Sequence, residues 1–114
     1  MYGDGSTSRD YTYVEDIVKG ILAAIDYTGS PFEIINLGNH YTVSLSEMIR
    51  TIEEVTGKKA VLNQLPEQAG DVPHTYADIS KAERLLGYHP ATSLKEGISN
   101  FYQWFLENKE ILLH

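Results

Sequence analysis

The apolar residues of this chain recur at helical spacing in four segments. The segments are residues 14–25, 45–55, 79–86 and 94–105, and their apolar positions lie three or four residues apart. That spacing places the apolar side chains on one side of a helix. We therefore predict four helices and expect the first to anchor the preceding turn to the core. Its apolar face consists of Val14, Ile17, Val18, Ile21, Leu22 and Ile25.

Polar residues at the ends of these segments predict where the helices begin and end. Ser44–Glu47 and Ser93–Glu96 have the serine-to-glutamate spacing of a capping box. Asp78 is a candidate cap for the short helix over residues 79–86. Gly57 and Gly87 follow the second and third segments, where a helix commonly ends in a left-handed glycine.

Two further runs are rich in β-branched and apolar residues and predict strands. Phe32–Leu37 lies between a Gly-Ser-Pro break and Gly38-Asn39, which indicates a buried strand. Residues 60–65 predict a second strand. The predicted fold class is α+β, with about four helices and a few short strands in a single domain over residues 1–114, and with the strand at Phe32–Leu37 in its centre.

The composition excludes several classes of function. The net charge of −7 argues against nonspecific binding to DNA or RNA, because such surfaces are normally basic. The longest apolar run is five residues, Ile21–Ile25, so we expect no membrane partner. There is no cysteine, and none of the four histidines has a second ligand at helical metal spacing. We therefore expect neither a disulfide nor a metal site.

The opening turn, Gly3–Asp10, is the first candidate binding element. Its two glycines permit backbone angles that other residues avoid, and the small hydroxyl residues between them and Arg9 offer hydroxyls and N–H groups. Arg9 offers a planar set of donors that matches phosphate oxygens. Asp10 is suited to orient a neighbour or to accept a backbone hydrogen bond. The spacing alone favours a hairpin turn carrying a surface ion pair over a binding element.

A second candidate lies in the loop at residues 68–72, with the sequence Gln-Ala-Gly-Asp-Val. The glycine allows a tight turn that presents Asp71, whose carboxylate can accept two hydrogen bonds from sugar hydroxyls. A solvated loop with Asp71 as a turn former is the competing interpretation.

Two catalytic patterns are absent from the sequence. There is no G-x-G-x-x-G dinucleotide fingerprint and no phosphate-binding P-loop. None of the eight tyrosines has a lysine four residues later, although Lys81 follows Tyr76 by five. The sequence therefore assigns no catalytic residue and no cofactor-binding residue.

Three longer motifs resemble the extended short-chain dehydrogenase/reductases, specifically the NAD-dependent nucleotide-sugar epimerases and dehydratases. They are GDGSTSRDYTYVEDIVKGI at residues 3–21, AGDVPHTYADISKAERLLGYHP at 69–90 and TSLKEGISNF at 92–101. They occur in the family's order and spacing over nearly the whole chain. The form of the loop from Gln68 onward looks closest to the UDP-glucuronate 4-epimerases.

The resemblance implies roles for three residues. Arg9 matches an arginine that binds the UDP diphosphate, and Asp71 matches an acidic residue that binds the uridine ribose hydroxyls. Gln68 stands where many galactose-type epimerases have a second phosphate-binding arginine, which weakens an assignment to UDP-galactose. These three residues are the predicted substrate-binding set.

The resemblance covers only the C-terminal, substrate-binding portion of the family, with the N-terminal Rossmann half absent. We therefore expect a fragment that binds a UDP-sugar but is not catalytic alone. The cofactor NAD would belong to the parent enzyme, and the partners would be the missing Rossmann domain and a second copy of the chain. The expected location is cytoplasmic. The same motifs occur in 4,6-dehydratases and UDP-glucose 4-epimerases, and a structural module with no ligand stays open.

Overall fold

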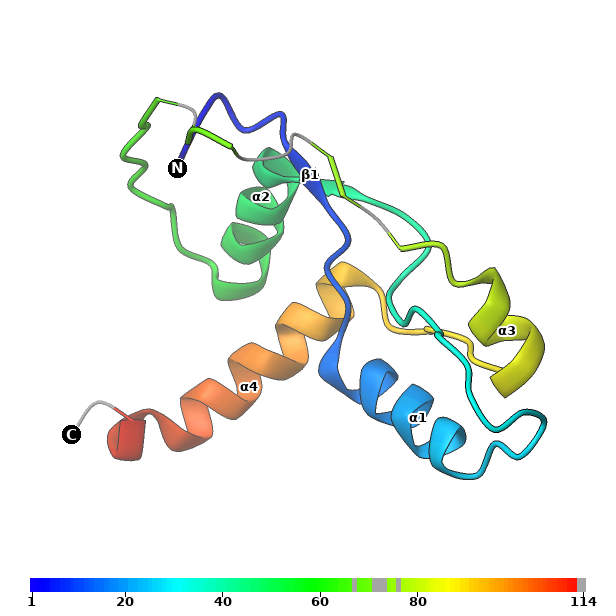
Figure 1. Cartoon of the computed structure of the whole chain (residues 1–114). Coiled ribbons are helices and arrows are strands. Elements are labelled where there is room, and N and C mark those ends of the chain that lie inside the picture. Colours follow the sequence, from blue (N-terminus) through cyan, green and yellow to red (C-terminus); the bar gives the residue numbers. More distant parts are fainter. Residues whose placement is uncertain (67, 71–73, 76, 113–114) are drawn as a thin grey trace.

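The computed structural model describes residues 1–66, 68–70, 74–75 and 77–112. These residues form an α+β fold with four helices and one two-stranded sheet, as predicted. In Figure 1, α4 extends away from α3, and α1 and α2 lie on either side of the start of α4. The helices are α1 (Val14–Ile25), α2 (Leu45–Thr56), α3 (Ser80–Leu86) and α4 (Leu94–Leu112), and the strands are β1 (Ser8–Arg9) and β2 (Val43–Ser44).

The sheet joins the opening turn to the start of α2. β1 and β2 are antiparallel, with Ser8 opposite Ser44 and Arg9 opposite Val43. Hydrogen bonds continue beyond the sheet, because the N–H of Leu45 donates to the carbonyl of Thr7 at 2.8 Å. The position of Arg9 is therefore fixed by backbone pairing with β2, the strand that leads directly into α2.

The core is small and centres on α3 and Tyr88. Ile79, Ala82 and Tyr88 are buried, and Leu37 is among the partly buried residues packed on them. α1 reaches this core through Gly20, where a Cβ atom would lie 2.8 Å from the methyl carbons of Leu37. A side chain at this position would therefore force α1 away from the core.

The predicted helix ends are largely confirmed. Ser44 accepts a hydrogen bond from the N–H of Glu47 at 3.1 Å, and Ser93 accepts one from the N–H of Glu96 at 3.2 Å. The glycines after α2 and α3 have left-handed φ angles of 69° and 65°. The prediction that Asp78 occupies the N-cap of α3 is wrong by one residue, because Ile79 occupies that position. Asp78 still accepts hydrogen bonds from the N–H and hydroxyl of Ser80.

The prediction of a central strand at Phe32–Leu37 is wrong. This run has no strand assignment, and in the described part of the chain no strand lies beside it. Its side chains nevertheless alternate, because Ile35 and Leu37 pack on the core while Phe32 and Ile34 are 74% and 71% exposed. An extended run becomes a strand only when a neighbouring backbone completes its hydrogen bonds. Residues 32–37 have the alternating side-chain pattern of a strand but no such neighbour among the described residues.

The second predicted strand, at residues 60–65, is also absent as a strand. Only Leu65 pairs, in a single parallel bridge with Tyr2. Val61 is fully exposed. A run without a buried face has little to hold it in a sheet, so its residue composition alone does not produce a strand.

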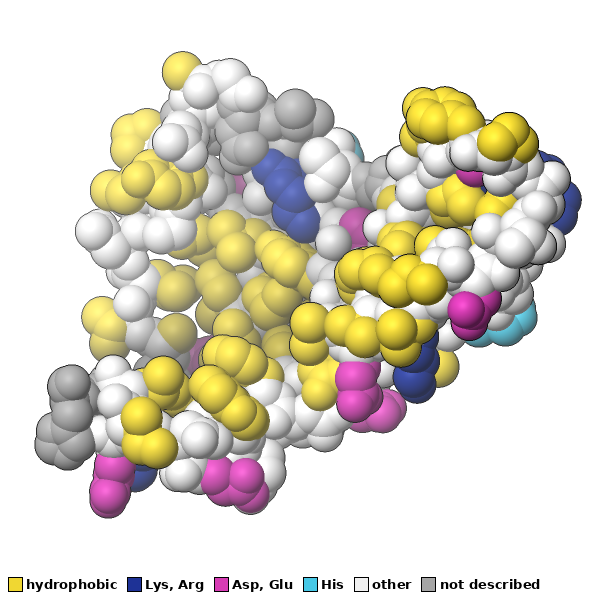
Figure 2. Space-filling view, turned by 60° about the horizontal axis from the view of Figure 1, so that its bottom comes forward, with side chains coloured by type: hydrophobic (Ala, Val, Ile, Leu, Met, Phe, Trp, Pro, Cys, Tyr) yellow, Lys and Arg dark blue, Asp and Glu magenta, His cyan; other side chains and the backbone are white. Residues whose placement is uncertain are grey.

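The apolar face of α1 does not form the core. Val14, Ile21 and Ile25 are 67%, 49% and 72% exposed, whereas Asp16 and Gly20 face the interior. Figure 2 shows apolar side chains gathered over a wide part of one face of the molecule and in a hollow within it. The accessible surface of the chain is 8233 Å², against about 6,300 Å² for a compact monomer of 12.8 kDa. The excess means that the fold leaves a large area for a partner.

α4 contributes apolar surface in its middle turns. Phe101 stacks on Trp104 with a ring separation of 6.2 Å, and both residues are exposed. Although α4 has 19 residues, neither it nor another helix in the described ranges is long and apolar enough to cross a membrane.

Tyr88 gives a test of the core through the pH dependence of stability. Its hydroxyl donates to the carbonyl of Gly38 at 2.7 Å, and burial, with the charge of Asp16 adding to it, raises the pKa of Tyr88 above its usual 10.0. The protonated tyrosine is therefore favoured in the folded state. Its contribution to stability is fully present below pH 10, begins to fall above it, and is lost as the pH rises through the folded-state pKa.

We expect Tyr88→Phe to lower the free energy of unfolding at pH 7 by about 1 kcal/mol, because the carbonyl of Gly38 loses its donor. We also expect the variant to lose less stability between pH 9 and pH 11 than the unmodified chain does. Urea unfolding followed by circular dichroism at a series of pH values measures both effects. Identical pH slopes for the two proteins would contradict this account.

Candidate functional site

The opening turn holds Arg9 in a defined place. Gly3 and Gly5 have positive φ angles of 74° and 88°, and the carboxylate of Asp4 accepts hydrogen bonds from the N–H and hydroxyl of Ser6. These bonds lower the pKa of Asp4. Arg9 is half-buried at the end of β1, and its Nη1 donates to the carbonyl of Ser8 at 2.8 Å. The turn thus presents one guanidinium from an ordered strand.

The fold brings the second candidate segment alongside the first. The N–H of Gly3 donates to the carbonyl of Leu65 at 2.7 Å, and the N–H of Thr75 donates to the carbonyl of Ser8 at 3.1 Å. Leu65 and Thr75, which precede and follow this loop segment in the chain, are therefore both bonded to the opening segment. Gln68 lies exposed in this loop, and Asp71 lies outside the described residues. The two sequence motifs, about 60 residues apart, are thus neighbours in the fold.

Asp10 joins three segments around the turn. Its carboxylate accepts hydrogen bonds from the N–H of Asn39 at 2.9 and 3.0 Å, from the hydroxyl of Thr12 at 2.9 Å and from the N–H of Ala77 at 3.2 Å. The predicted role of Asp10 as a backbone acceptor is confirmed. Its two backbone donors could not be predicted, because they lie 29 and 67 residues away along the chain.

A polar cavity of about 410 Å³ lies next to Asp10. Two carboxylates and two hydroxyl groups are among its lining, and a carboxylate accepts hydrogen bonds from ligand hydroxyls. Two lining residues, Asn36 and Thr75, were not predicted to belong to a site, although Asn36 is the one amide in the run Phe32–Leu37. The full lining is Asp10, Thr12, Asn36, Leu37, Gly38, Thr75, Ala77 and Asp78.

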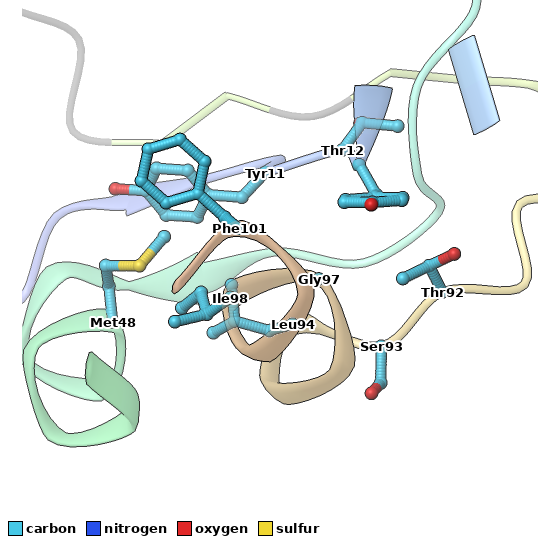
Figure 3. A pocket seen from close by; sticks show the side chains of 10 residues that line it. Tyr11, Thr12, Met48, Thr92, Ser93, Leu94, Gly97, Ile98 and Phe101 are labelled. Atoms are coloured by element: carbon cyan, nitrogen blue, oxygen red, sulfur yellow. The ribbon is translucent and has the colours of Figure 1, made fainter. Parts of the chain in front are cut away.

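A second cavity, of about 170 Å³, is almost wholly apolar. Figure 3 shows its side chains coming from α2, from α4 and from the connection between β1 and α1. Tyr11, Met48, Ile98 and Phe101 contribute most of the visible apolar groups. None of its lining residues is a cation.

No cluster of three or more potential metal ligands occurs among the described residues. The described site offers the guanidinium of Arg9 and a polar cavity lined by the neighbouring Asp10.

This α+β fold is that of the C-terminal portion of nucleotide-sugar enzymes. A family model described as GDP-mannose 4,6 dehydratase matches residues 1–101. The chain therefore belongs to this family of NAD-dependent nucleotide-sugar epimerases and dehydratases, as the sequence motifs indicated.

Individual relatives agree with this assignment. The chain is 50% identical over 113 residues to protein MJ1055 of Methanocaldococcus jannaschii, and 40% identical over 113 residues to a UDP-glucuronate 4-epimerase of Thermodesulfobacterium geofontis. These matches cover 99% and 98% of this chain and 34% of each relative.

Solved structures give the same result. Epimerase Mth375 of Methanothermobacter thermautotrophicus superposes with a TM-score of 0.91 at 38% identity, over 97% of this chain and 33% of that one. The Bacillus cereus UDP-glucuronic acid 4-epimerase, in complex with UDP-glucuronic acid and NAD, gives a TM-score of 0.85 at 37% identity, over 94% and 34%. The chain thus spans about a third of the length of these relatives.

Proposed function

We propose that this chain is the UDP-sugar-binding portion of an NAD-dependent epimerase of the UDP-glucuronate 4-epimerase type. The observation that carries the proposal is the position of Arg9, held on β1 against the ends of the loop that contains Gln68 and Asp71. In this proposal the guanidinium binds the diphosphate, the amide of Gln68 adds a neutral donor, and Asp71 binds the ribose hydroxyls. The complex of the B. cereus epimerase with UDP-glucuronic acid supports this ligand class.

The proposal assigns NAD to another part of the enzyme. The chain has no glycine-rich dinucleotide fingerprint, so its own residues do not fit the cofactor's pyrophosphate. NAD, when bound in the parent enzyme, would oxidise and then reduce the sugar. This chain's part would be to hold the nucleotide, using binding energy from a non-reacting group to position the reacting carbon.

We also propose that the exposed apolar surface of α1 and of residues 32–34 receives the dinucleotide-binding part of the enzyme. We name this surface the α1 face and define it as Val14, Val18, Ile21, Leu22, Ile25, Phe32 and Ile34, which are 44–74% exposed. The accessible surface of the chain exceeds that of a compact monomer by about 1,900 Å², which is comparable to the area buried in a permanent interface. The unpaired run at 32–34 and the two thirds of the relatives' length that this chain does not match support the same occupant.

Arg9→Ala tests the diphosphate role directly. A charge-assisted hydrogen bond to phosphate contributes about 1.5–3 kcal/mol, so we expect UDP affinity to fall roughly ten- to a hundredfold. Arg9→Lys should recover only part of the loss, because an ammonium keeps the charge but not the planar donors. The isolated chain should bind UDP in the millimolar range, so nitrogen-edited NMR titration is the suitable measurement, with initial slopes compared between variants.

Arg84→Ala is the matched control, since it removes an exposed arginine from α3. It should leave the UDP titration unchanged. GDP-mannose titrated in parallel separates the UDP-sugar epimerase assignment from the dehydratase alternative that the family description raises. Equal UDP affinities for the unmodified chain and Arg9→Ala would refute the diphosphate role.

A further inference from the structure

The carboxylate of Asp10 is the most connected side-chain acceptor near Arg9. It accepts from the N–H of Asn39 with both oxygens, from the hydroxyl of Thr12, and from the N–H of Ala77. These donors belong to three separate segments, at residues 12, 39 and 77. One side chain thus ties the end of β1 to the segment after the 66–73 loop.

We infer that Asp10 is the positioning residue of the nucleotide site, which fixes the position of Arg9 relative to Thr75 and Ala77. The inference rests on the proposed role of Arg9 in binding a diphosphate. Asp10 itself would not touch the nucleotide. It would act by holding the backbone from which the arginine projects.

The local geometry gives this inference its physical basis. Successive side chains of an extended segment point to opposite sides, so fixing Asp10 fixes the rotation of the backbone that carries Arg9. The same carboxylate accepts a hydrogen bond from the N–H of Ala77, and the N–H of Thr75 donates to the carbonyl of Ser8. The segment of Thr75 and Ala77 is therefore attached to the residues on both sides of Arg9. A shift of Asp10 would therefore move the arginine relative to Thr75 and Ala77.

The packing around Gly38 shows how closely this arrangement is fitted. A Cβ atom at Gly38 would lie 2.8 Å from Oδ2 of Asp10 and 2.8 Å from Cβ of Ala77. The absence of a side chain here lets the carboxylate reach the backbone N–H groups of Asn39 and Ala77. An asparagine at position 10 would occupy the same space but could not accept all of these hydrogen bonds, because its NH₂ group would face N–H donors.

The test is a double-mutant cycle on UDP affinity with Asp10→Asn and Arg9→Ala in the full 114-residue chain, measured by NMR titration. We expect Asp10→Asn to weaken UDP binding at least fivefold in the unmodified background. We expect it to have less than a twofold effect once Arg9 is alanine, because Asp10 acts only through Arg9. A purely structural role would give the same fold-change in both backgrounds.

Asp16→Asn is the matched control. Asp16 is also a buried carboxylate, and it accepts from the N–H of Thr92 at 3.2 Å, away from the Arg9 turn. The variant should lower the urea midpoint while leaving the UDP affinity of the folded protein within twofold. An equal loss of affinity in Asp16→Asn and Asp10→Asn would overturn the inference.

Thr12→Val provides a milder variant in case Asp10→Asn does not fold. It removes one donor to Asp10 while keeping the side-chain shape, and should weaken UDP binding two- to threefold. Unchanged affinity in this variant would overturn the inference. Reduced affinity in Arg9→Ala with none in Asp10→Asn refutes the positioning role alone, whereas no effect of Arg9→Ala refutes the proposed function on which it rests.

Discussion

The 114-residue chain alone is expected to convert neither UDP-glucuronate nor UDP-galactose, with or without added NAD. It has no tyrosine followed four residues later by a lysine, and no dinucleotide fingerprint. In the proposed function the general base and the hydride carrier belong to the other part of the enzyme. Enzymes typically accelerate reactions at least about a millionfold, so the loss of this machinery removes detectable turnover.

A hybrid protein provides a second test, in which activity is expected to appear. It joins the present chain to the N-terminal two thirds of the T. geofontis UDP-glucuronate 4-epimerase, which is 40% identical in the matched region. We expect the hybrid to epimerise UDP-glucuronate, and expect Arg9→Ala in it to lower kcat/KM. Turnover by the isolated chain above a blank would contradict the assignment of catalysis to the other part of the enzyme. A well-folded hybrid with no activity would contradict the assignment of UDP-sugar binding to this chain.

The second large effect concerns the α1 face. In the absence of the dinucleotide-binding part, we expect this face to pair with a second copy of the chain or to aggregate, because an exposed apolar patch of this size drives association. Replacing Ile21 and Phe32 by Asp removes two large apolar side chains. Each contributes about 1.5–3 kcal/mol when buried, so association should weaken by roughly a hundredfold or more.

The double variant Ile111→Asp, Leu112→Asp is the control. It makes the same change of charge on exposed apolar residues at the far end of α4. Sedimentation velocity over a range of concentrations should show associated species for the unmodified chain and for the control, and monomer for the Ile21→Asp, Phe32→Asp variant. A strictly monomeric unmodified chain at high concentration would contradict the prediction, as would equal effects of the two double variants.

The helices and their ends were predictable because their causes are local. The bond from Glu47 to Ser44 and the left-handed angle at Gly57 involve residues close together in the chain, so composition and spacing suffice to indicate them. The family was also predictable, since its motifs are continuous stretches of sequence. Arg9 and Gln68 could be selected as candidates for the same reason, although their roles stay predictions.

The orientation of α1 and the state of residues 32–37 were not predictable from the same patterns. Both segments have residues suited to burial, but burial needs a second surface, and a strand needs a second backbone. Spacing predicted that α1 has an apolar face, and the tertiary structure decided that Gly20 and Asp16 face the interior instead. The described residues therefore leave much of this apolar pattern exposed, and in the proposed function it belongs to the interface with the dinucleotide-binding part.

The amino-acid sequence by itself determined the four helices, the glycine-rich turn that carries Arg9, and the family. Only the tertiary structure decided that Leu65 and Thr75 bond to the opening segment, and that Asp10 binds Asn39 and Ala77. The physical reason is that helix formation depends on neighbours three or four residues away, whereas these hydrogen bonds join backbone groups 29 and 67 residues distant from Asp10. Backbone donors are present at almost every position, so no residue type marks the ones that a carboxylate will reach.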